Sequence, residues 1–402
     1  MIISAARMIT GDGRTVLQDH GVLVNSQGRL SAIAPTASLL AACPNQEHIA
    51  FPQGTLIPGL IDLHAHLTVP MSSADPHLHS DYTQAYLALE QCRRAFSRGV
   101  TTVRSLCCRP GLEDALRHAG AHLLPIPRLV SSGRGICMTG GHGHDLGPGV
   151  EEVDGPEALR RAVRTRVREG HRWIKVLTSH RSERPEFTQE ELDALTDEGH
   201  RLGCRLAVHA GTRTAVDMCI RAGFDTIEHG TFMTVEQAAQ MRSKGIVWVP
   251  TIIAYSSAYQ QMRPAGDPQA PSPALRYFQQ ADAAYRDGFL ARVQTGVAIA
   301  AGTDLCVDGF TDLNIPRELQ YYTDYGMDPL SAIACATSVG AEVLGLGGVT
   351  GRLAPGLEAN MILVEGDPSR DIRALSQVRR VFLSGKTVWQ WDERGEGPQL
   401  PV

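Results

Sequence analysis

Strand-like apolar runs alternate with helix-like segments through the middle of this 402-residue chain, and this alternation constrains the fold more than any other feature. The pattern is typical of parallel βαβ units, in which a helix carries the chain back to the start of the next strand. The helix-like segments 154–170 and 188–203 each begin with a capping residue and end with glycine. Eight strand-like runs can be counted, at 55–67, 99–106, 127–133, 173–179, 204–210, 225–230, 246–252 and 297–304. Eight such repeats are what a closed (β/α)8 barrel requires, and these barrels carry their chemistry at the C-terminal ends of the strands.

The two ends of the chain have a different pattern. Residues 1–55 and 350–402 read as short alternating strands separated by turn signals. We therefore predict an α/β protein in which residues 56–349 form a (β/α)8 TIM barrel and both termini together form a small β-sandwich domain.

Composition narrows the partners of the protein. With 43% hydrophobic residues the chain can bury a large core, and its net charge of -5 comes without any cluster of Lys and Arg that would attract nucleic acid or an anionic membrane. The N-terminus lacks the pattern of a secretory signal, and no segment approaches the roughly 20 apolar residues of a membrane span. We expect a cytoplasmic protein with a small-molecule substrate. A homo-oligomer would be common for such a protein, but the sequence leaves the oligomeric state open.

Side chains that can bind metal stand at the ends of five of the eight runs. His64 and His66 end the first run, and because residues i and i+2 of a strand project to the same face, both can hold one cation. The others are Lys175 on the fourth run, His209 on the fifth, His229 on the sixth and Asp304 on the eighth. A single histidine at a strand end is more often a hydrogen-bonded core residue than a ligand. Six suitable side chains at the functional end of one barrel favour a metal site.

The His-x-His spacing occurs at two further places. His77 and His79 follow a proline in a polar segment, and His142 and His144 are interleaved with glycines. Neither pair has a strand beneath it to hold both rings on one face. We expect the first of these pairs on the surface and the second in a glycine-rich loop beside the site.

Lys175 needs an explanation of its own, because its apolar neighbours place it on a strand that a barrel would bury. An unpaired ammonium there would face a large desolvation cost. A buried lysine with a depressed pKa is nucleophilic and can react with carbon dioxide to give a carbamate, whose oxygens can bridge two cations. The alternative is a lysine that reaches the rim and pairs with a carboxylate. The histidines around the same cavity favour the carbamate.

The order of these motifs resembles the amidohydrolase superfamily of metal-dependent hydrolases over essentially the whole chain. The motifs are PGLIDLHAH, the lysine in IKVLTS, VHA, IEHG and AGTD, between β-rich ends. GVTTVRS, GRGICMTGGHGH and DPLSAIACATSVGAEVLGL resemble the branch that contains imidazolonepropionase-like proteins and the two-metal Xaa-Pro and Xaa-Arg/Lys dipeptidases or carboxypeptidases. The lysine favours the dipeptidases, because imidazolonepropionases use a single metal without a carbamylated lysine.

The resemblance implies a binuclear centre. His64, His66 and Asp304 would bind the more buried metal, His209 and His229 the other, and carbamylated Lys175 would bridge both. A hydroxide shared by the two divalent cations would attack the amide carbon, while Asp304 would take the proton and return it to the leaving amine. Zinc suits these ligands best, although ligand types alone do not exclude manganese, iron or cobalt.

Four residues are candidates for substrate binding. The resemblance places a substrate-binding histidine in the glycine-rich loop, so we expect His142 to contact the reacting carbonyl or a terminal carboxylate, with His144 beside it. Tyr255 occupies a region where relatives use a tyrosine for the substrate, the alternative being ordinary aromatic packing. Arg104 could meet an anionic group of the substrate. Relatives commonly read Arg-Asp-Gly/Leu-Gly-Gly at this strand, and the residues after Arg104 here are Ser-Leu-Cys-Cys, so the adjoining pocket wall must differ.

We therefore predict a binuclear metal-dependent hydrolase that cleaves an amide bond, with a dipeptide or an N-acyl amino acid carrying a free carboxylate as its substrate. The alternative substrates are a cyclic amide, a carbamate or a xenobiotic amide, because fold and metal centre do not determine the substrate. A non-catalytic scaffold would be expected to have lost metal ligands, and none of the six is missing.

Overall fold

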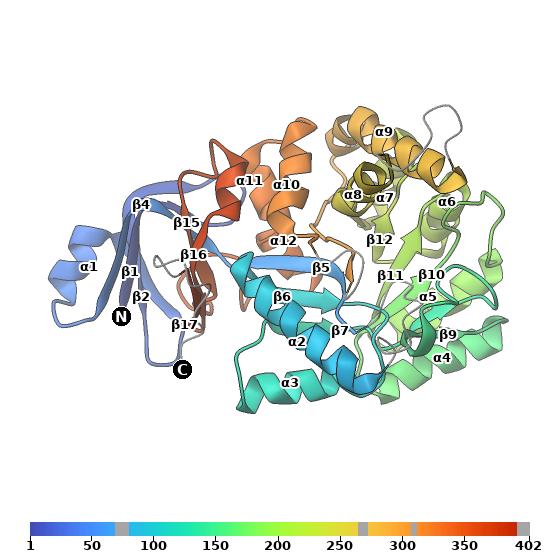
Figure 1. The fold of residues 1–402 in the computed structure, drawn as a ribbon, viewed down its shortest axis with the longest axis horizontal. Helices are drawn as coiled ribbons and strands as arrows, with labels where there is room; N and C mark the ends of the chain where they lie inside the picture. The colour runs from blue at the N-terminus through green and yellow to red at the C-terminus, as the bar shows by residue number, and fades with distance from the viewer. Residues whose placement is uncertain (69–79, 264–271, 307–311, 392–402) are drawn as a thin grey trace.

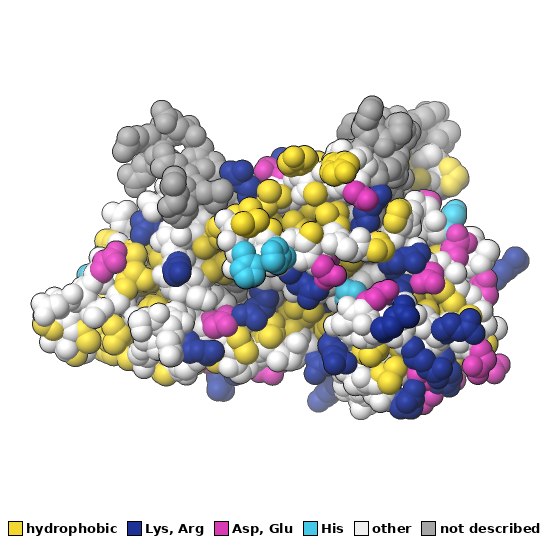
Figure 2. All heavy atoms as spheres, turned by 90° about the horizontal axis from the view of Figure 1, so that it is seen from below, with side chains coloured by type: hydrophobic (Ala, Val, Ile, Leu, Met, Phe, Trp, Pro, Cys, Tyr) yellow, Lys and Arg dark blue, Asp and Glu magenta, His cyan; other side chains and the backbone are white. Residues whose placement is uncertain are grey.

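The computed structural model describes residues 1–68, 80–263, 272–306 and 312–391. It is an α/β fold in which a sheet made from both ends of the chain lies to one side, and parallel strands surrounded by helices form the rest (Figure 1). Within the described ranges no helix is long and apolar enough to cross a membrane. Figure 2 shows one face of the molecule, on which basic and acidic side chains are interspersed, as the spread of charge along the sequence leads one to expect.

Parallel strands form two sheets in the larger region, with the orders β13-β12-β11-β10-β8-β9 and β14-β5-β6-β7. Their bounds are β5 Leu60–His66, β6 Val100–Ser105, β7 Arg128–Ser131, β8 Gly135–Cys137, β9 Val150–Glu152, β10 Trp173–Leu177, β11 Arg205–Ala210, β12 Thr226–His229, β13 Val247–Val249 and β14 Leu305–Cys306. Nearly every residue of β5, β6 and β10 to β12 is buried, which is typical of parallel strands covered on both faces.

The segment 298–304 connects the two parallel sheets on one side. The amide of Trp248 donates to the carbonyl of Ala298, and the amide of Leu63 donates to the carbonyl of Ala301, each at 2.9 Å, so this segment bonds to both β13 and β5. On the other side, no strand pairing joins β7 to β10 within the described residues. The structure thus shows the parallel α/β arrangement, whereas closure of the expected barrel is not detected.

The strand-like runs of the sequence correspond to strands with three differences. The first run divides at Gly59, because its residues up to Pro58 belong to β4 (His48–Pro58) of the other sheet. A Cβ at Gly59 would lie 2.2 Å from Thr101 Oγ1, so this corner requires glycine. The last run, 297–304, is extended but forms only an isolated bridge before β14. The short strands β8 and β9 were not expected, because three residues carry too little alternation to be recognised.

Helices cover the parallel strands (Figure 1). α5 (Gln189–Arg201) starts with a capping box, in which the Thr188 hydroxyl accepts from the amide of Glu191 and the Glu191 carboxylate accepts from the amide of Thr188. α4 (Pro156–Arg168) starts after Gly155 without a side-chain cap. The other helices are α1 Thr36–Ala42, α2 Asp81–Ser97, α3 Leu112–His122, α6 Arg213–Ala222, α7 Val235–Lys244, α8 Ile252–Met262, α9 Pro273–Gln294, α10 Ile315–Asp324, α11 Pro329–Cys335 and α12 Ser338–Val343.

Both ends of the chain contribute to one seven-stranded sheet with the order β17-β16-β15-β4-β1-β2-β3. The bounds of its other strands are β1 Ile2–Ile9, β2 Val16–Val24, β3 Leu30–Pro35, β15 Met361–Glu365, β16 Val378–Leu383 and β17 Lys386–Gln390. The pairing of β15 with β4 unites the two ends of the sequence. The strands form one continuous hydrogen-bonded sheet rather than two separate ones, so the β-sandwich is not confirmed. The domain boundaries near residues 55 and 350 stay a prediction.

Candidate metal centre

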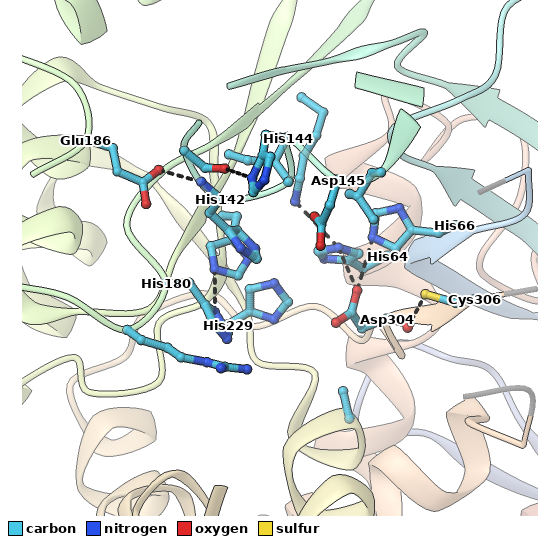
Figure 3. A pocket seen from close by; sticks show the side chains of 18 of the residues that line it. His64, His66, His142, His144, Asp145, His180, Glu186, His229, Asp304 and Cys306 are labelled. Atoms are coloured by element: carbon cyan, nitrogen blue, oxygen red, sulfur yellow. Dashed lines mark hydrogen bonds and ion pairs between the residues drawn. The ribbon is translucent and has the colours of Figure 1, made fainter. Parts of the chain in front are cut away.

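A cavity of about 580 Å³ lies at the C-terminal ends of the parallel strands (Figure 3). Strands β5 and β12 end in histidines that line it, and His209 is the next-to-last residue of β11. Strand β10 contributes Lys175, and the segment after Ala298 contributes Asp304. The cavity is lined by all six predicted metal ligands and by three of the predicted substrate contacts, namely His64, His66, Lys175, His209, His229 and Asp304, and His142, His144 and Tyr255. His77 and His79 lie outside the described residues.

An inner cluster consists of His64, His66, Lys175, His229 and Asp304. Asp304 lies between two imidazoles, with its Oδ1 3.3 Å from His64 Nε2 and 3.1 Å from His66 Nε2. His64, His229 and Asp304 offer ligand atoms within 4.8 Å of one another. Burial raises the pKa of Asp304, but the neighbouring imidazoles outweigh it and hold that pKa well below its usual value. An ionised carboxylate among imidazole nitrogens is a donor set that zinc accepts.

The rings of His64 and His66 are oriented by hydrogen bonds at their Nδ1 atoms. His64 Nδ1 lies 2.7 Å from Glu228 Oε2, and His66 Nδ1 donates to the carbonyl of Leu106 at 2.8 Å. A carbonyl or an ionised carboxylate can only accept, so Nδ1 carries the hydrogen in each ring. In a neutral ring the lone pair is then on Nε2, the atom that faces Asp304. Metal-binding histidines in proteins are held in this way. Against the effect of burial, the hydrogen bond to Asp304 raises the pKa of His66 to about 10, so a cation bound here would displace a proton from that ring.

His229 is oriented similarly, by a threonine. Its Nδ1 lies 2.6 Å from Thr251 Oγ1, and Thr251 donates its own hydrogen to the carbonyl of Pro250. The hydroxyl can therefore only accept from His229, which leaves Nε2 of this ring with its lone pair. Trp248 Nε1 and the Tyr285 hydroxyl donate to the carbonyl of His229 at 2.7 and 3.1 Å, which also fixes the backbone.

A buried charge network lies behind the inner cluster and includes Arg104. Its guanidinium donates to Glu228 at 2.7 Å, to Thr226 Oγ1 at 3.2 Å and to the carbonyl of Leu63 at 2.6 Å, and the side chain is fully buried. Burial raises the pKa of Glu228, but Arg104 and His64 outweigh this and keep that pKa well below its usual value. Arg104 is not among the residues that line the cavity. Its position corrects the expectation that it meets the substrate, because all of its described bonds are to residues behind the histidines.

Asp62 supports the candidate site from behind, and the sequence analysis did not select it. It accepts from the amide of His64 at 3.0 Å and from the amide and hydroxyl of Thr303 at 3.1 and 2.6 Å. Burial raises the pKa of Asp62 to about 6 against the effect of these bonds. The residue ties β5 to the segment that carries Asp304. Its place two residues before His64, on the same face of the strand, was the available signal.

Two of the predicted ligands have backbone conformations that residues other than glycine rarely adopt. The φ angle is +65° at His229 and +62° at Asp304. Each residue stands where a strand or an extended segment turns outward, and such strain persists only when the surroundings over-determine it. Gly302 permits the approach of the last segment, because a Cβ there would lie 2.7 Å from the Cβ of His64.

Lys175 is buried, with 1% of its surface exposed, and its Nζ lies 3.5 Å from His64 Nε2. Burial lowers the pKa of its amine, against the attraction of Glu228 and Asp304. No carboxylate of the described residues forms an ion pair with it, so the alternative of a lysine paired at the rim is not what the structure shows. Burial thus shifts the equilibrium toward the neutral amine, which is the form that can react to give a carbamate.

An outer cluster consists of His142, His180 and His209, whose ligand atoms also lie within 4.8 Å of one another. His180 Nδ1 is 2.9 Å from His209 Nε2. The ring of His142 stacks on His180 with a centroid distance of 4.6 Å and an interplanar angle of 11°. Burial lowers the pKa of all three imidazoles, to about 4 for His142, so the rings are neutral. His180 was missed because it follows β10 in irregular chain, where no strand end marks it.

The glycine-rich loop holds His142 and His144 at one side of the cavity (Figure 3). Glu186 Oε2 accepts from the amide of His142 at 3.0 Å, and a Cβ at Gly141 would lie 2.9 Å from the same oxygen. His144 Nδ1 lies 2.9 Å from the carbonyl of Gly141, so the local loop fixes its ring. The loop is thus anchored by a carboxylate that needs a glycine beside it.

Aromatic rings and one arginine form the opposite wall. Tyr255, near the start of α8, is buried and contacts the ring of His229 edge-on at a centroid distance of 5.5 Å. Arg181 is exposed and lines the cavity, with its guanidinium 5.0 Å from the ring centroid of Tyr277 and 5.7 Å from that of Phe278. The structure therefore provides an arginine at the cavity that sequence reasoning did not select.

Comparisons with known proteins agree with this arrangement. The sequence profile of the Amidohydrolase family matches residues 55–388. Ochratoxinase of Aspergillus niger is 27% identical over 452 residues, which cover 99% of this chain and 90% of that protein. A solved structure of a Xaa-Pro dipeptidase with bound methionine in the active site has a TM-score of 0.83 at 28% identity and covers 96% of this chain and 98% of that one. The structure of A. niger ochratoxinase has a TM-score of 0.81 at 25% identity, with coverage of 96% and 94%. The resemblance expected from the motifs is confirmed.

Proposed function

The chain belongs to the amidohydrolase family of hydrolases acting on carbon–nitrogen bonds, and we propose that it is a two-metal enzyme that cleaves the amide of a dipeptide or an N-acyl amino acid. The enzyme class follows from the family and from relatives named ochratoxinase and Xaa-Pro dipeptidase. We propose three points beyond the enzyme class. The protein binds two metal ions, Lys175 is carbamylated, and the substrate carries a free carboxylate.

One observation carries the metal centre, namely that His64, His66 and His229 each use Nδ1 in a hydrogen bond to the protein. Their Nε2 lone pairs are thereby available beside the carboxylate of Asp304, and these donors fit zinc. Two divalent cations bound in the cavity would polarise the amide carbonyl and lower the pKa of a water toward neutrality.

Lys175 supports the second cation. Its amine is buried and burial lowers its pKa; in the neutral form it can add to carbon dioxide, which forms an N–C bond and releases one proton. The resulting carbamate has a negative charge and two oxygens, whereas an ammonium would repel cations held by His64, 3.5 Å away. This balance of charge favours the carbamate in the loaded enzyme.

The reacting groups have distinct tasks in this proposal. Asp304 is ionised and takes a proton from the attacking water, then returns it to the leaving amine. His142, on the glycine-rich loop, contacts the carbonyl oxygen of the substrate, with His144 next to it. Tyr255 closes the wall beside His229.

Arg181 supports a substrate with a free carboxylate. It lines the cavity, and its guanidinium lies over Tyr277, a contact that keeps its charge near the entrance. The charged guanidinium suits a carboxylate, with which it can form two parallel hydrogen bonds. Arg181 takes the task that the sequence had assigned to Arg104.

The two parallel sheets are also compatible with the barrel expected for this family. We propose that they are two parts of one (β/α)8 barrel, and the backbone bonds of segment 298–304 to both sheets support this. The cavity then occupies the C-terminal end of the barrel, where such enzymes carry their chemistry.

The proposal is tested by assaying the zinc-loaded chain against dipeptides, N-acyl amino acids and versions of both with the carboxylate capped as an amide. We expect turnover of the free acids, loss of turnover after chelation and recovery with added zinc. Absence of turnover of any carboxylate-bearing amide would contradict the proposal. Turnover of capped compounds, cyclic amides or carbamates in their place would support the alternative substrates.

A further inference from the structure

We propose that His180 is a metal ligand, and that it shares with His209 the outer of the two cations. This inference rests on the proposed two-metal function, but the resemblance assigns no such role to His180. The outer cation would then have an imidazole that the sequence motifs did not indicate.

The spacing of the two rings carries the inference. His180 Nδ1 and His209 Nε2 are 2.9 Å apart. Two nitrogens bound to one tetrahedral zinc at about 2.0–2.1 Å lie roughly 3.3 Å from each other, so a small outward shift would accommodate an ion. His180 is one of the residues that line the cavity, as labelled in Figure 3.

The backbone around His180 is tied to the strand that carries His209. The amide of Thr178 donates to the carbonyl of His209 at 3.2 Å, and the amide of Gly211 donates to the carbonyl of Ser179 at 3.1 Å. A Cβ at Gly211 would lie 2.4 Å from the carbonyl oxygen of His180, so a glycine is required for this approach. These contacts hold the two segments together on either side of the ring pair.

A second contact anchors His180 from the opposite side. The Tyr277 hydroxyl donates to its carbonyl at 3.3 Å, and the rings of the two residues are 5.0 Å apart. The side chain is therefore held between α9 and β11, and its position does not depend on the ring contact with His209 alone. A ligand that is held in place by its surroundings loses little conformational entropy when it binds an ion.

His142 is less suited than His180 to share an ion with His209. Its ring is stacked on that of His180 and nearly parallel to it, so one ion cannot lie in the planes of both rings. His180 is thus the better partner for His209, while His142 stays free to contact the substrate.

The experiment measures metal binding and needs no turnover. Chain stripped with a chelator is titrated with Co²⁺ and Zn²⁺, and the bound equivalents, their dissociation constants and the visible spectrum of cobalt are recorded. We expect two ions in the unaltered protein. In His180→Ala the affinity for the second ion should fall by roughly 10- to 100-fold or more, while the first should change little.

Two matched variants separate ligation from packing. An Asp Oδ atom is as many bonds from Cα as the Nδ1 atom of histidine, so His180→Asp should restore the second ion to within about tenfold. His144→Ala removes another imidazole from the cavity wall and should keep both ions. Each variant is compared with the unaltered protein by circular dichroism, and His180→Asp carries the test if His180→Ala does not fold.

The inference is overturned if His180→Ala binds two ions with unchanged affinities, or if His180→Asp is as deficient as His180→Ala. It is also overturned if His144→Ala loses the second ion to the same extent. These outcomes would leave the proposed function intact, because that proposal fails only when the unaltered protein binds no metal or turns over no carboxylate-bearing amide.

Discussion

The inner and outer clusters are both built on histidine, but they differ in what lies behind the rings. In the inner cluster His64 is held by Glu228, which is itself paired with Arg104, and all three side chains are buried. In the outer cluster His142 and His180 come from loops and are half-buried. The inner cluster is thus part of the protein core, whereas two of the three rings of the outer cluster lie at its rim and only His209 is buried.

This difference indicates a division of labour. A ligand set supported by buried charges keeps its geometry whatever occupies the cavity, which suits the reacting atoms. His142 stands on the glycine-rich loop, and a loop can adjust to different groups, which suits recognition of a substrate. The following predictions test whether the two clusters differ as this division requires.

The largest expected effect is on catalysis at the inner cluster. Asp304→Asn keeps the size of the side chain but removes the proton acceptor, so kcat should fall by roughly 10²- to 10⁴-fold. The comparison is His144→Ala on the outer side, where we expect a change of less than tenfold. Steady-state kinetics of both variants, with metal content measured in parallel, checks this. Unchanged kcat in Asp304→Asn would mean that the inner cluster is not catalytic.

The second prediction concerns stability. Glu228→Gln leaves the buried guanidinium of Arg104 without its counter-charge, and the free energy of unfolding should fall by about 3–5 kcal/mol. Glu186→Gln, at the half-buried anchor of the outer loop, should cost about 1 kcal/mol or less. Urea denaturation of the two metal-free variants measures both values. Equal losses would remove the distinction between core and rim.

The third prediction uses Glu318, a buried carboxylate that forms no ion pair with any described residue. Glu318 accepts from the amides of Ile252 and Ile253 at the start of α8, the helix that carries Tyr255. Burial raises its pKa to about 8, from 4.5 in an unfolded chain. The folded protein therefore retains a proton that the unfolded chain has released, and stability falls as the pH rises between these values, by about 1.4 kcal/mol per unit.

Glu318→Gln should remove this dependence. Relative to the unaltered protein, the variant should gain stability between pH 6 and pH 7.5, as measured by denaturant unfolding at each pH. Glu228→Gln should show no such gain, because Arg104 and His64 keep the pKa of Glu228 low. A difference between the Glu318→Gln variant and the unaltered protein that is the same at both pH values would contradict the assignment.

The smallest expected effect is on substrate binding at the rim. Arg181→Ala should raise KM for a free-acid substrate by roughly tenfold and leave KM for the capped amide unchanged, because only the carboxylate contact is lost. Arg184→Ala, a nearby exposed arginine that does not line the cavity, serves as the control. Equal changes for both substrates would place Arg181 outside the recognition of the carboxylate.

The same contrast explains what could be predicted from the sequence. The inner ligands stand at the ends of buried strands, and the period of two in a strand placed His64 and His66 on one face without any knowledge of their neighbours. The family that these motifs predicted is confirmed by the match to the family profile. His180 could not be found in this way, because it is positioned by contacts with β11 and α9 that join distant parts of the chain.

Arg104 is a second residue whose environment could not be predicted from the sequence. Its place near a strand end suggested a substrate contact, but its burial depends on Glu228, which is 124 residues away in the sequence. Closure of the barrel and the sandwich arrangement of the termini also depend on long-range pairing. Here the structure shows two parallel sheets and one seven-stranded sheet.

The Arg104–Glu228–His64 network has a consequence for how the molecule opens. Arg104 and His64 belong to the four-stranded sheet and Glu228 to the six-stranded sheet, so the network crosses from one to the other. The sheets cannot separate locally without exposing a buried ion pair. Amide hydrogens of β5 and β12 should therefore exchange with solvent at one common rate, through a single cooperative opening of the whole region. The proposed catalytic centre would then also set the slowest fluctuation of the fold.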